Sequence, residues 1–171
     1  MRRGVIQALG VVLLFVLFAV AGLCLRTWGF GLVRISGTSM NNTLRDGDIV
    51  LVTRFDYLGD RVPDFGHVVE CTFPGRADTY VKRVAGLPGE TIELRSGLLY
   101  RDELRISEPY VSSLAEDYQI TLGSEEYLLL GDNRAESYDS RMEDMGTVGA
   151  SAFLGRARFV IWPLNRLGKV R

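Results

Sequence analysis

The stretch Thr79-Tyr80-Val81-Lys82-Arg83-Val84-Ala85-Gly86 has the composition of a β-strand, with β-branched and aromatic residues and a glycine at its end. Alternate side chains of a strand point to the same face, so Lys82 lies between Tyr80 and Val84. Such neighbours favour removal of the amine from water, which lowers the pKa of a lysine toward that of a general base. The alternative is a solvated lysine on an edge strand.

The composition of basic residues makes Lys82 stand out further. Of the 20 basic residues, 18 are arginine, and Lys82 and Lys169 are the only lysines. The simplest interpretation of this bias is a coding habit. Arginine cannot give up its proton in a protein, however, whereas a buried lysine can.

The chain after residue 25 is predicted to be mainly β. Short runs rich in Val, Ile, Leu and Tyr are separated by glycine and proline, and no helix of more than two turns is expected. The expected strands are 48–52, 67–71, 79–84, 90–94, 97–100, 119–122, 127–130 and 157–162.

The amino-terminal stretch Gly4–Leu25 is almost entirely apolar, with Gln7 its only strongly polar residue. As a helix rising about 1.5 Å per residue it would be about 33 Å long, which is enough to cross a bilayer. The alternative is a cleaved signal peptide with Arg2-Arg3 as its basic region and Ala19-Val20-Ala21 as its cleavage site. Because the apolar run continues to Leu25, past that site, a retained anchor is favoured.

Composition excludes several classes of function. The chain is 47% hydrophobic and 24% charged, which argues against a disordered or collagen-like protein. A net charge of −1 gives no electrostatic footprint for nucleic acid. Two cysteines and one histidine, far apart in the sequence, cannot build a structural zinc site, so no metal and no cofactor is expected.

Two further segments carry side chains that could take part in catalysis. Ser39 follows small residues on a turn, where a hydroxyl and a backbone N–H can face the same point, as a nucleophile with an oxyanion site requires. Downstream of the turn at 131–134, Ser137 could orient an amine, and Asp139 and Arg141 are spaced for an ion pair. Each segment alone also fits a polar loop.

A Ser-His-Asp triad would have to use His67, the only histidine. It stands at the start of a predicted strand, where a surface histidine is the better interpretation. We therefore expect that His67→Ala does not abolish activity.

Taken together, three segments in this order resemble the boxes of bacterial type I signal peptidases, which are membrane-bound Ser-Lys endopeptidases. Ser36–Asp48 is similar to the nucleophile box, Tyr80–Glu90 to the lysine box, and Gly131–Arg141 to the third box. The resemblance implies a signal-peptidase-like antiparallel β-sheet catalytic domain behind one transmembrane helix. It also implies that Ser39 is the nucleophile and Lys82 the general base.

The resemblance also implies an organisation and a location. Residues 1–3 would be a short cytoplasmic amino terminus and 4–25 a transmembrane helix. Residues 26–171 would be an extracytoplasmic catalytic domain, with 91–126 a smaller β insertion. The protein would be a single-pass protein of the bacterial cytoplasmic membrane, where Trp28, Phe30 and Leu32 fit either the lipid interface or a packed core.

The resemblance assigns the remaining roles. Ser137 would position the lysine amine, and Asp139 with Arg141 would brace the loop. Substrates would be exported preproteins with small residues at the first and third positions before the cut, met at the bilayer and near the export translocon. The implied substrate-binding residues are Ile35, Met40, Leu44, Tyr80 and Val81.

Three departures from the family pattern keep other functions open. Asn42 replaces the family proline, His67 stands where aspartate is usual, and Gly149 stands where proline is usual. One alternative is a catalytically impaired binding module on the same fold. The other is a specialised Ser-Lys peptidase, such as a conjugation-type processing enzyme or a self-cleaving repressor-like switch, although the apolar segment disfavours the repressor.

Overall fold

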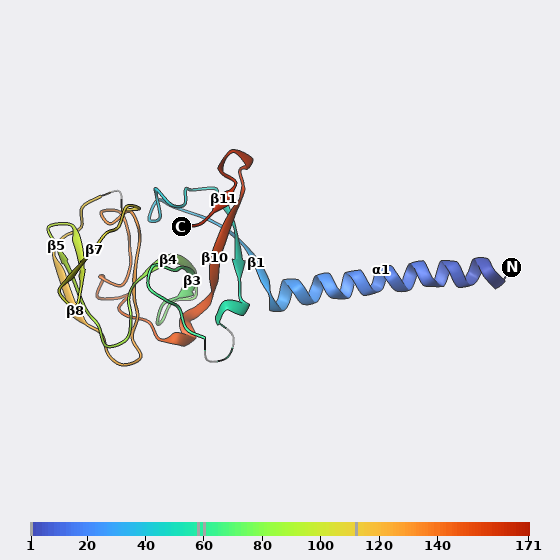
Figure 1. The fold of residues 1–171 in the computed structure, drawn as a ribbon, viewed down its shortest axis with the longest axis horizontal. Coiled ribbons are helices and arrows are strands. Elements are labelled where there is room, and N and C mark those ends of the chain that lie inside the picture. Colours follow the sequence, from blue (N-terminus) through green and yellow to red (C-terminus); the bar gives the residue numbers. More distant parts are fainter. Residues whose placement is uncertain (1, 58, 60, 112) are drawn as a thin grey trace.

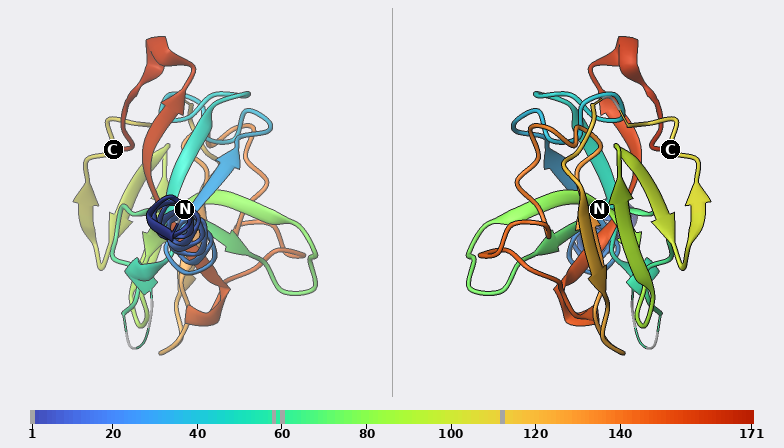
Figure 2. Two further views of the ribbon diagram at one scale, coloured as in Figure 1. Left: turned by 90° about the vertical axis from the view of Figure 1, so that its right-hand side faces the viewer. Right: turned by 90° about the vertical axis from the view of Figure 1, so that its left-hand side faces the viewer.

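An amino-terminal helix and a β-rich domain make up the computed structural model, which describes residues 2–57, 59, 61–111 and 113–171. Within helix α1 (Arg2–Trp28) it describes the side chains of residues 7 and 10–23. The helix projects from one end of the domain, and a small sheet lies at the opposite end (Figure 1). Viewed along the helix, the strands spread around its axis and a carboxy-terminal hairpin projects to one side (Figure 2).

A seven-stranded antiparallel sheet forms the body of the domain. Its strand order is β1-β2-β10-β3-β4-β9, and β11 pairs with β10. The strands are β1 (Phe30–Arg34), β2 (Ile49–Thr53), β3 (Val68–Thr72), β4 (Thr79–Gly86), β9 (Leu128–Leu130), β10 (Phe153–Trp162) and β11 (Gly168–Lys169). The prediction of a mainly β, antiparallel domain is therefore confirmed.

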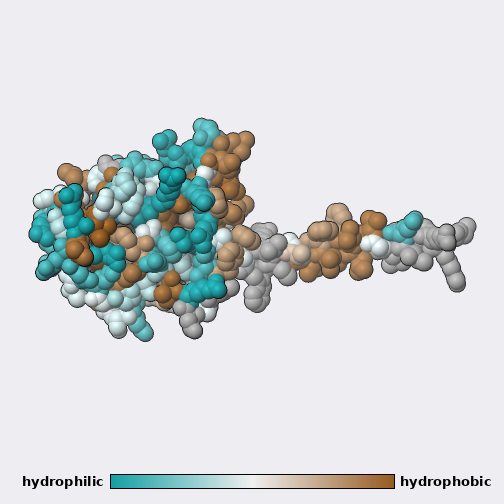
Figure 3. All heavy atoms as spheres, in the orientation of Figure 1, coloured by the Kyte–Doolittle hydropathy of each residue, from teal (hydrophilic) through white to brown (hydrophobic). Residues whose placement is uncertain are grey.

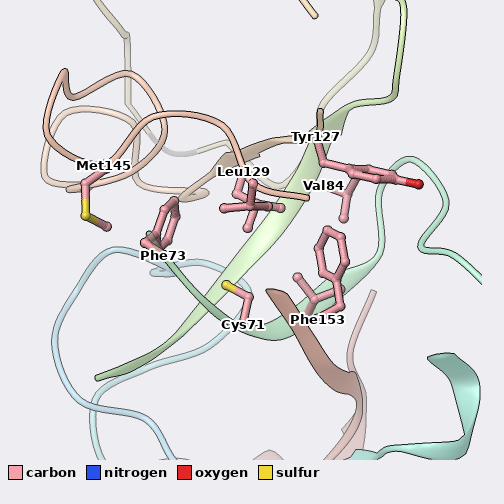
Figure 4. Packing of buried hydrophobic residues seen from close by; sticks show 9 residues of the cluster. Cys71, Phe73, Val84, Tyr127, Leu129, Met145 and Phe153 are labelled. Carbon is pink, nitrogen blue, oxygen red and sulfur yellow. The ribbon is translucent and has the colours of Figure 1, made fainter. Parts of the chain in front are cut away.

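Strands β3 and β9 and the second half of β4 are buried on both faces of the large sheet. Alternate residues of β3 enter different cores, because Val68 packs with one cluster and Val69 with another. The cluster around Val69 also holds aromatic and sulfur side chains, which interlock as Figure 4 shows. A strand covered on both sides reads as a continuous apolar run, which explains why strict alternation is rare in this sequence.

A second antiparallel sheet follows β4 in the chain and lies within residues 91–126. Its order is β7-β6-β5-β8, with β5 (Thr91–Arg95), β6 (Leu98–Arg101), β7 (Leu104–Ile106) and β8 (Tyr118–Thr121). Its core packs directly on the end of β4, where a Cβ added to Gly86 would lie 2.6 Å from Ile92 Cγ1. Only glycine permits this contact between the sheets.

Sequence reasoning identified most strands but missed three at the edges of the sheets. β1, β7 and β11 were not expected, and two of them contain a glycine while the third has three residues. After α1, the described helices are three 3-10 turns, namely η1 (Phe55–Tyr57), η2 (Ala150–Ala152) and η3 (Leu164–Arg166). Apart from the last residues of α1, the expectation that no helix of more than two turns follows residue 25 therefore holds for the described part of the chain.

Helix α1 contains the predicted helix over 4–25 and extends beyond it at both ends. Among the residues that the structure describes, no helix is long and apolar enough to cross a membrane. The predicted helix is thus found. The alternative cleavage site Ala19-Val20-Ala21 lies inside this helix.

Candidate active site

Ser39 and Lys82 share the wall of one open pocket of about 510 Å³. One wall comes from β1 and the turn that carries Ser39, and the other comes from the first half of β4. The lining residues are Val33, Arg34, Ile35, Ser36, Ser39, Met40, Asp78, Thr79, Tyr80, Val81 and Lys82.

The turn that carries Ser39 depends on an unusual backbone conformation at Asn42, which has a φ of 84°. Asparagine tolerates this left-handed region, whereas the proline ring fixes φ near −65°. Hydrogen bonds from Asn41 N to Thr38 O (3.0 Å) and from Leu44 N to Met40 O (2.8 Å) close the turn. The departure at position 42 therefore has a conformational reason.

Ser39 itself keeps its donors available. Its side chain is half-buried, and in the described part of the chain neither its hydroxyl nor its backbone N–H donates a hydrogen bond to the protein. In particular, its hydroxyl makes no hydrogen bond to Lys82, a looseness common in sites without substrate. A free N–H beside a free hydroxyl is what an oxyanion site next to a nucleophile needs.

Lys82 is almost fully buried, with 3% of its surface exposed. Its Nζ donates a hydrogen bond of 3.0 Å to Ser137 Oγ. Burial lowers the pKa of this amine, and the carboxylate of Asp139 opposes part of that effect. The predicted desolvation of Lys82 is therefore present, and Ser137 is the partner of its amine.

Asp139 and Arg141 form the ion pair that their spacing predicted. Arg141 Nε donates to Asp139 Oδ1 at 2.8 Å, and Arg141 Nη2 also donates to the main-chain oxygen of Arg134 at 2.7 Å. The other oxygen of Asp139 accepts a hydrogen bond from Gly131 N at 2.9 Å. These bonds close the loop on both sides of Ser137.

Gly131 and Asn133 hold the Ser39 turn against this loop, which sequence reasoning missed. A Cβ at Gly131 would lie 2.1 Å from Ser137 Oγ and 2.5 Å from the main-chain oxygen of Ser39. Asn133 donates from its backbone to Ser39 O (3.0 Å) and from its side chain to Thr38 O (3.2 Å). The only sequence signal was Gly-Asp-Asn, which predicts a turn. It does not predict that this turn contacts the segment of Ser39.

A buried ion pair between Arg83 and Asp132 joins the lysine strand to the third segment. Arg83 Nη2 and Nε lie 2.7 and 2.8 Å from the two Asp132 oxygens, and both side chains are at most 3% exposed. Thr43 of the nucleophile segment donates to the same carboxylate and accepts from Arg83 Nη2 at 3.1 Å. One network therefore ties together all three segments found in the sequence.

Four of the five predicted substrate-binding residues line the pocket: Ile35, Met40, Tyr80 and Val81. Leu44 departs from the prediction, because its side chain is fully buried in the core and lines no part of this pocket. The charged lining residues Arg34 and Asp78 were missed. Nothing in their local sequence indicates a pocket, because the tertiary approach of β1 to β4 creates it.

His67 lies outside this pocket. Its Nδ1 accepts a hydrogen bond from Asp64 N at 3.2 Å and is 3.2 Å from Tyr57 Oη, and burial lowers its pKa. These contacts give His67 a place in the packing below η1. Within the described residues, no group of three or more histidine, cysteine or acidic side chains is arranged to hold a metal ion.

Comparison with known proteins now decides the family. The family described as "Signal peptidase, peptidase S26" matches residues 6–162. The chain belongs to this family. As a member of the signal peptidase family it is a hydrolase, a serine endopeptidase of the signal peptidase I type.

Relatives of similar length support the assignment to the signal peptidase family. Signal peptidase I of Bacillus licheniformis is 29% identical over 90% of this chain and 88% of its own length. Signal peptidase I of Streptococcus pneumoniae is 32% identical over 80% of this chain and 84% of its own. A crystal structure of a signal peptidase I from Enterococcus faecalis matches 57% of this chain and 98% of its own, with a TM-score of 0.51 and 29% identity.

Removal of Asp132 tests the network that joins the three segments. In Asp132→Ala the guanidinium of Arg83 stays buried without its counter-charge, so we expect the free energy of unfolding to fall by about 3–5 kcal/mol. Chemical denaturation of the full chain in detergent measures this change. Asp144→Ala is the matched control, because it breaks the exposed ion pair with Arg76 and should change stability little. Equal changes in the free energy of unfolding for the two substitutions would contradict a larger stabilising contribution from the buried pair.

Proposed function

We propose that this signal peptidase family member removes amino-terminal signal peptides from exported preproteins, with Ser39 as nucleophile and Lys82 as general base. The observation that carries the proposal is the buried Lys82 amine, hydrogen-bonded to Ser137 and sharing a pocket with Ser39. A lysine held out of water gives up its proton more readily, so it can accept one from a serine hydroxyl.

The proposed reaction proceeds in two halves. Ser39 Oγ attacks the scissile carbonyl while Lys82 takes its proton, and Lys82 then gives a proton to the departing amine. In the second half a water molecule loses a proton to Lys82 and attacks the ester carbon. As the ester C–O bond breaks, Lys82 returns that proton to Ser39 Oγ, and the signal peptide leaves with a free carboxyl end. The free backbone N–H of Ser39 donates to the negative oxygen in both halves.

The third segment acts in this proposal by positioning. Ser137 accepts a hydrogen bond from Lys82 Nζ. This bond orients the amine so that the lone pair of neutral Lys82 faces the pocket. Asp139 and Arg141 hold Ser137 in place through the bonds to Gly131 N and Arg134 O. The carboxylate of Asp139 also limits how far the pKa of Lys82 falls.

The substrate is proposed to bind as an extended segment along β4. Strand β9 pairs with β4 only from Arg83 onward, so within the described residues the edge of β4 over 79–82 has no strand partner on that side. A peptide can add to such an edge through main-chain hydrogen bonds. Ile35, Met40 and Val81 then bound the space for its side chains and favour small residues before the cut.

Attachment to the membrane is proposed from two exposed apolar surfaces. Residues 11–18, 20 and 23 of α1 present large apolar side chains that are more than half exposed. A second surface, the apolar rim, lies on the side of the domain from which α1 extends (Figure 3). The rim consists of Phe30, Leu32, Phe159, Trp162, Leu164 and Leu167. Extracytoplasmic placement of the domain and closeness to the export translocon remain predictions from the family resemblance.

Replacement of Lys82 by arginine tests the base. Lys82→Arg keeps the positive charge but cannot release a proton, so cleavage of a signal-peptide substrate should fall at least about a thousandfold. Cleavage by Ser39→Ala should fall by as large a factor. Lys169→Arg alters the other lysine of the chain and should retain wild-type turnover. Substantial cleavage by Lys82→Arg or by Ser39→Ala would break the proposed mechanism, and retained peptide binding without turnover in the wild type would favour a binding module.

The pH dependence of cleavage follows from the lowered pKa of Lys82. The base works only when neutral, so log kcat/KM should rise with slope one and level off at a pH below the ordinary lysine value of 10.5. The free energy of unfolding should also rise with pH, because Lys82 binds a proton more tightly in the unfolded chain than in the fold. The fold therefore loses stability as pH drops from the unfolded pKa of Lys82 through its folded pKa. The rising part of this pH profile, its basic limb, should persist in His67→Ala. Loss of the limb in that variant would assign the base to His67 instead.

Fluorescence tests the proposed contact of the rim with lipid. Trp28 and Trp162 are the only tryptophans, so Trp28→Phe leaves Trp162 as the single reporter. Vesicles containing brominated lipid should quench this emission, because Trp162 would lie at the lipid interface. The control is a tryptophan introduced as Leu104→Trp, on the small sheet at the far end, in a chain without the other two. Absence of quenching at Trp162, or equal quenching at both positions, would contradict the proposed orientation.

A further inference from the structure

Glu70 is a carboxyl group placed beside the substrate pocket by the register of the large sheet. In the pairing of β3 with β4 it stands directly opposite Val81. Residues directly opposite in an antiparallel pair share a face, with Cβ atoms about 4.5–5.5 Å apart. Since Val81 lines the pocket that holds Ser39, the Glu70 side chain leaves the sheet next to the wall of that pocket.

The carboxyl of Glu70 has no partner in the described part of the protein. Only 7% of the residue is exposed, and Oε2 is fully buried without a hydrogen bond. Oε1 also accepts no hydrogen bond but is not sealed from solvent. Burial raises the pKa of Glu70, and the positive charge of Arg54 offsets only part of this effect. Among the described residues Arg54 makes no ion pair with Glu70, and its guanidinium lies over Gly31.

Apart from Arg54, whose Cγ lies 3.4 Å from the position of a Cβ built on Gly155, Glu70 has Val68 and Gly155 as apolar neighbours. Val68, two residues earlier on the same face, packs with Ile35 and Met40 of the pocket wall. On the other side, Glu70 stands opposite Gly155 of β10, which has no side chain to offer. A buried carboxyl without a hydrogen bond costs stability, so a valine here would suit the fold better. A stability cost at the edge of a binding pocket indicates a functional use.

We propose that Glu70 is a specificity-determining residue whose carboxyl accepts a hydrogen bond from a serine or threonine hydroxyl of the bound signal peptide. The inference rests on the proposed function, because it assigns a substrate preference to the same pocket. Side chains at the first and third positions before the cut point the same way in an extended peptide, so both face this wall. The protein therefore prefers Ser to Ala, or Thr to Val, at one of these positions.

Matched peptide pairs test this preference with the full-length protein in detergent. One pair differs only by Val or Thr at the third position before the cut, and the other only by Ala or Ser at the first. The ratio of kcat/KM within each pair is measured for the wild type, Glu70→Val and Glu70→Gln. The ratio of affinities is measured in the Ser39→Ala background by fluorescence anisotropy, which reports binding without turnover.

We expect the hydroxyl peptide of at least one pair to lose about tenfold in relative kcat/KM and affinity in Glu70→Val, the scale of one hydrogen bond to a charged or buried group. Glu70→Gln should retain most of the preference, since its amide oxygen still accepts. Glu70→Val should also unfold at a higher denaturant concentration than the wild type. Glu143→Val, at an exposed glutamate, should leave the ratios unchanged.

Unchanged ratios in Glu70→Val, with cleavage still dependent on Ser39, would overturn the role of Glu70 and leave the proposed function standing. A preference that shifts equally in Glu143→Val would overturn it as well. Cleavage that persists in Ser39→Ala would instead overturn the proposed function, and the affinity ratios would still report on Glu70.

Discussion

The active site depends on the buried ion pair between Arg83 and Asp132, because Thr43 bonds to both partners and all three catalytic segments thereby meet in one network. Arg83 lies next to Lys82 on β4, Asp132 follows β9, and Thr43 belongs to the turn of Ser39. Each guanidinium nitrogen of Arg83 donates to at least one acceptor, and a fork of this geometry defines orientation as well as distance. The reacting groups stand one or a few residues from this network, so its geometry fixes theirs.

Burial of Lys82 sets a balance between two opposing effects. Removal from water lowers the pKa of the amine, whereas the nearby carboxylate of Asp139 raises it. A full ion pair with Asp139 would hold Lys82 charged and end its use as a base. The structure avoids this because Arg141 and Gly131 N take up both oxygens of Asp139, while Lys82 contacts the neutral hydroxyl of Ser137.

Much of this site could be predicted from sequence because its groups sit in short local patterns. The strand around Lys82, the ion pair of Asp139 with Arg141 and the helix over residues 4–25 each depend on neighbours in the chain. Gly131 and Leu44 show where such reasoning ends. The tight approach of Gly131 to Ser39, and the burial of Leu44 beneath the pocket, arise from contacts between distant segments. The edge strand β1 was missed for the same reason, since its pairing with β2 defines it more than its own residues do.

The period of two along a strand explains how the sheet carries two buried ionisable groups so close together. Lys82 stands opposite Val69, and Glu70 stands opposite Val81, so the amine and the carboxyl leave the sheet on opposite faces. A glutamate at position 69 or 71 would share the face of Lys82, pair with its amine and raise its pKa. At position 70 the carboxyl can serve the pocket while the sheet itself separates it from the base. The same register thus permits an acceptor for substrate and a neutral lysine within adjacent strands.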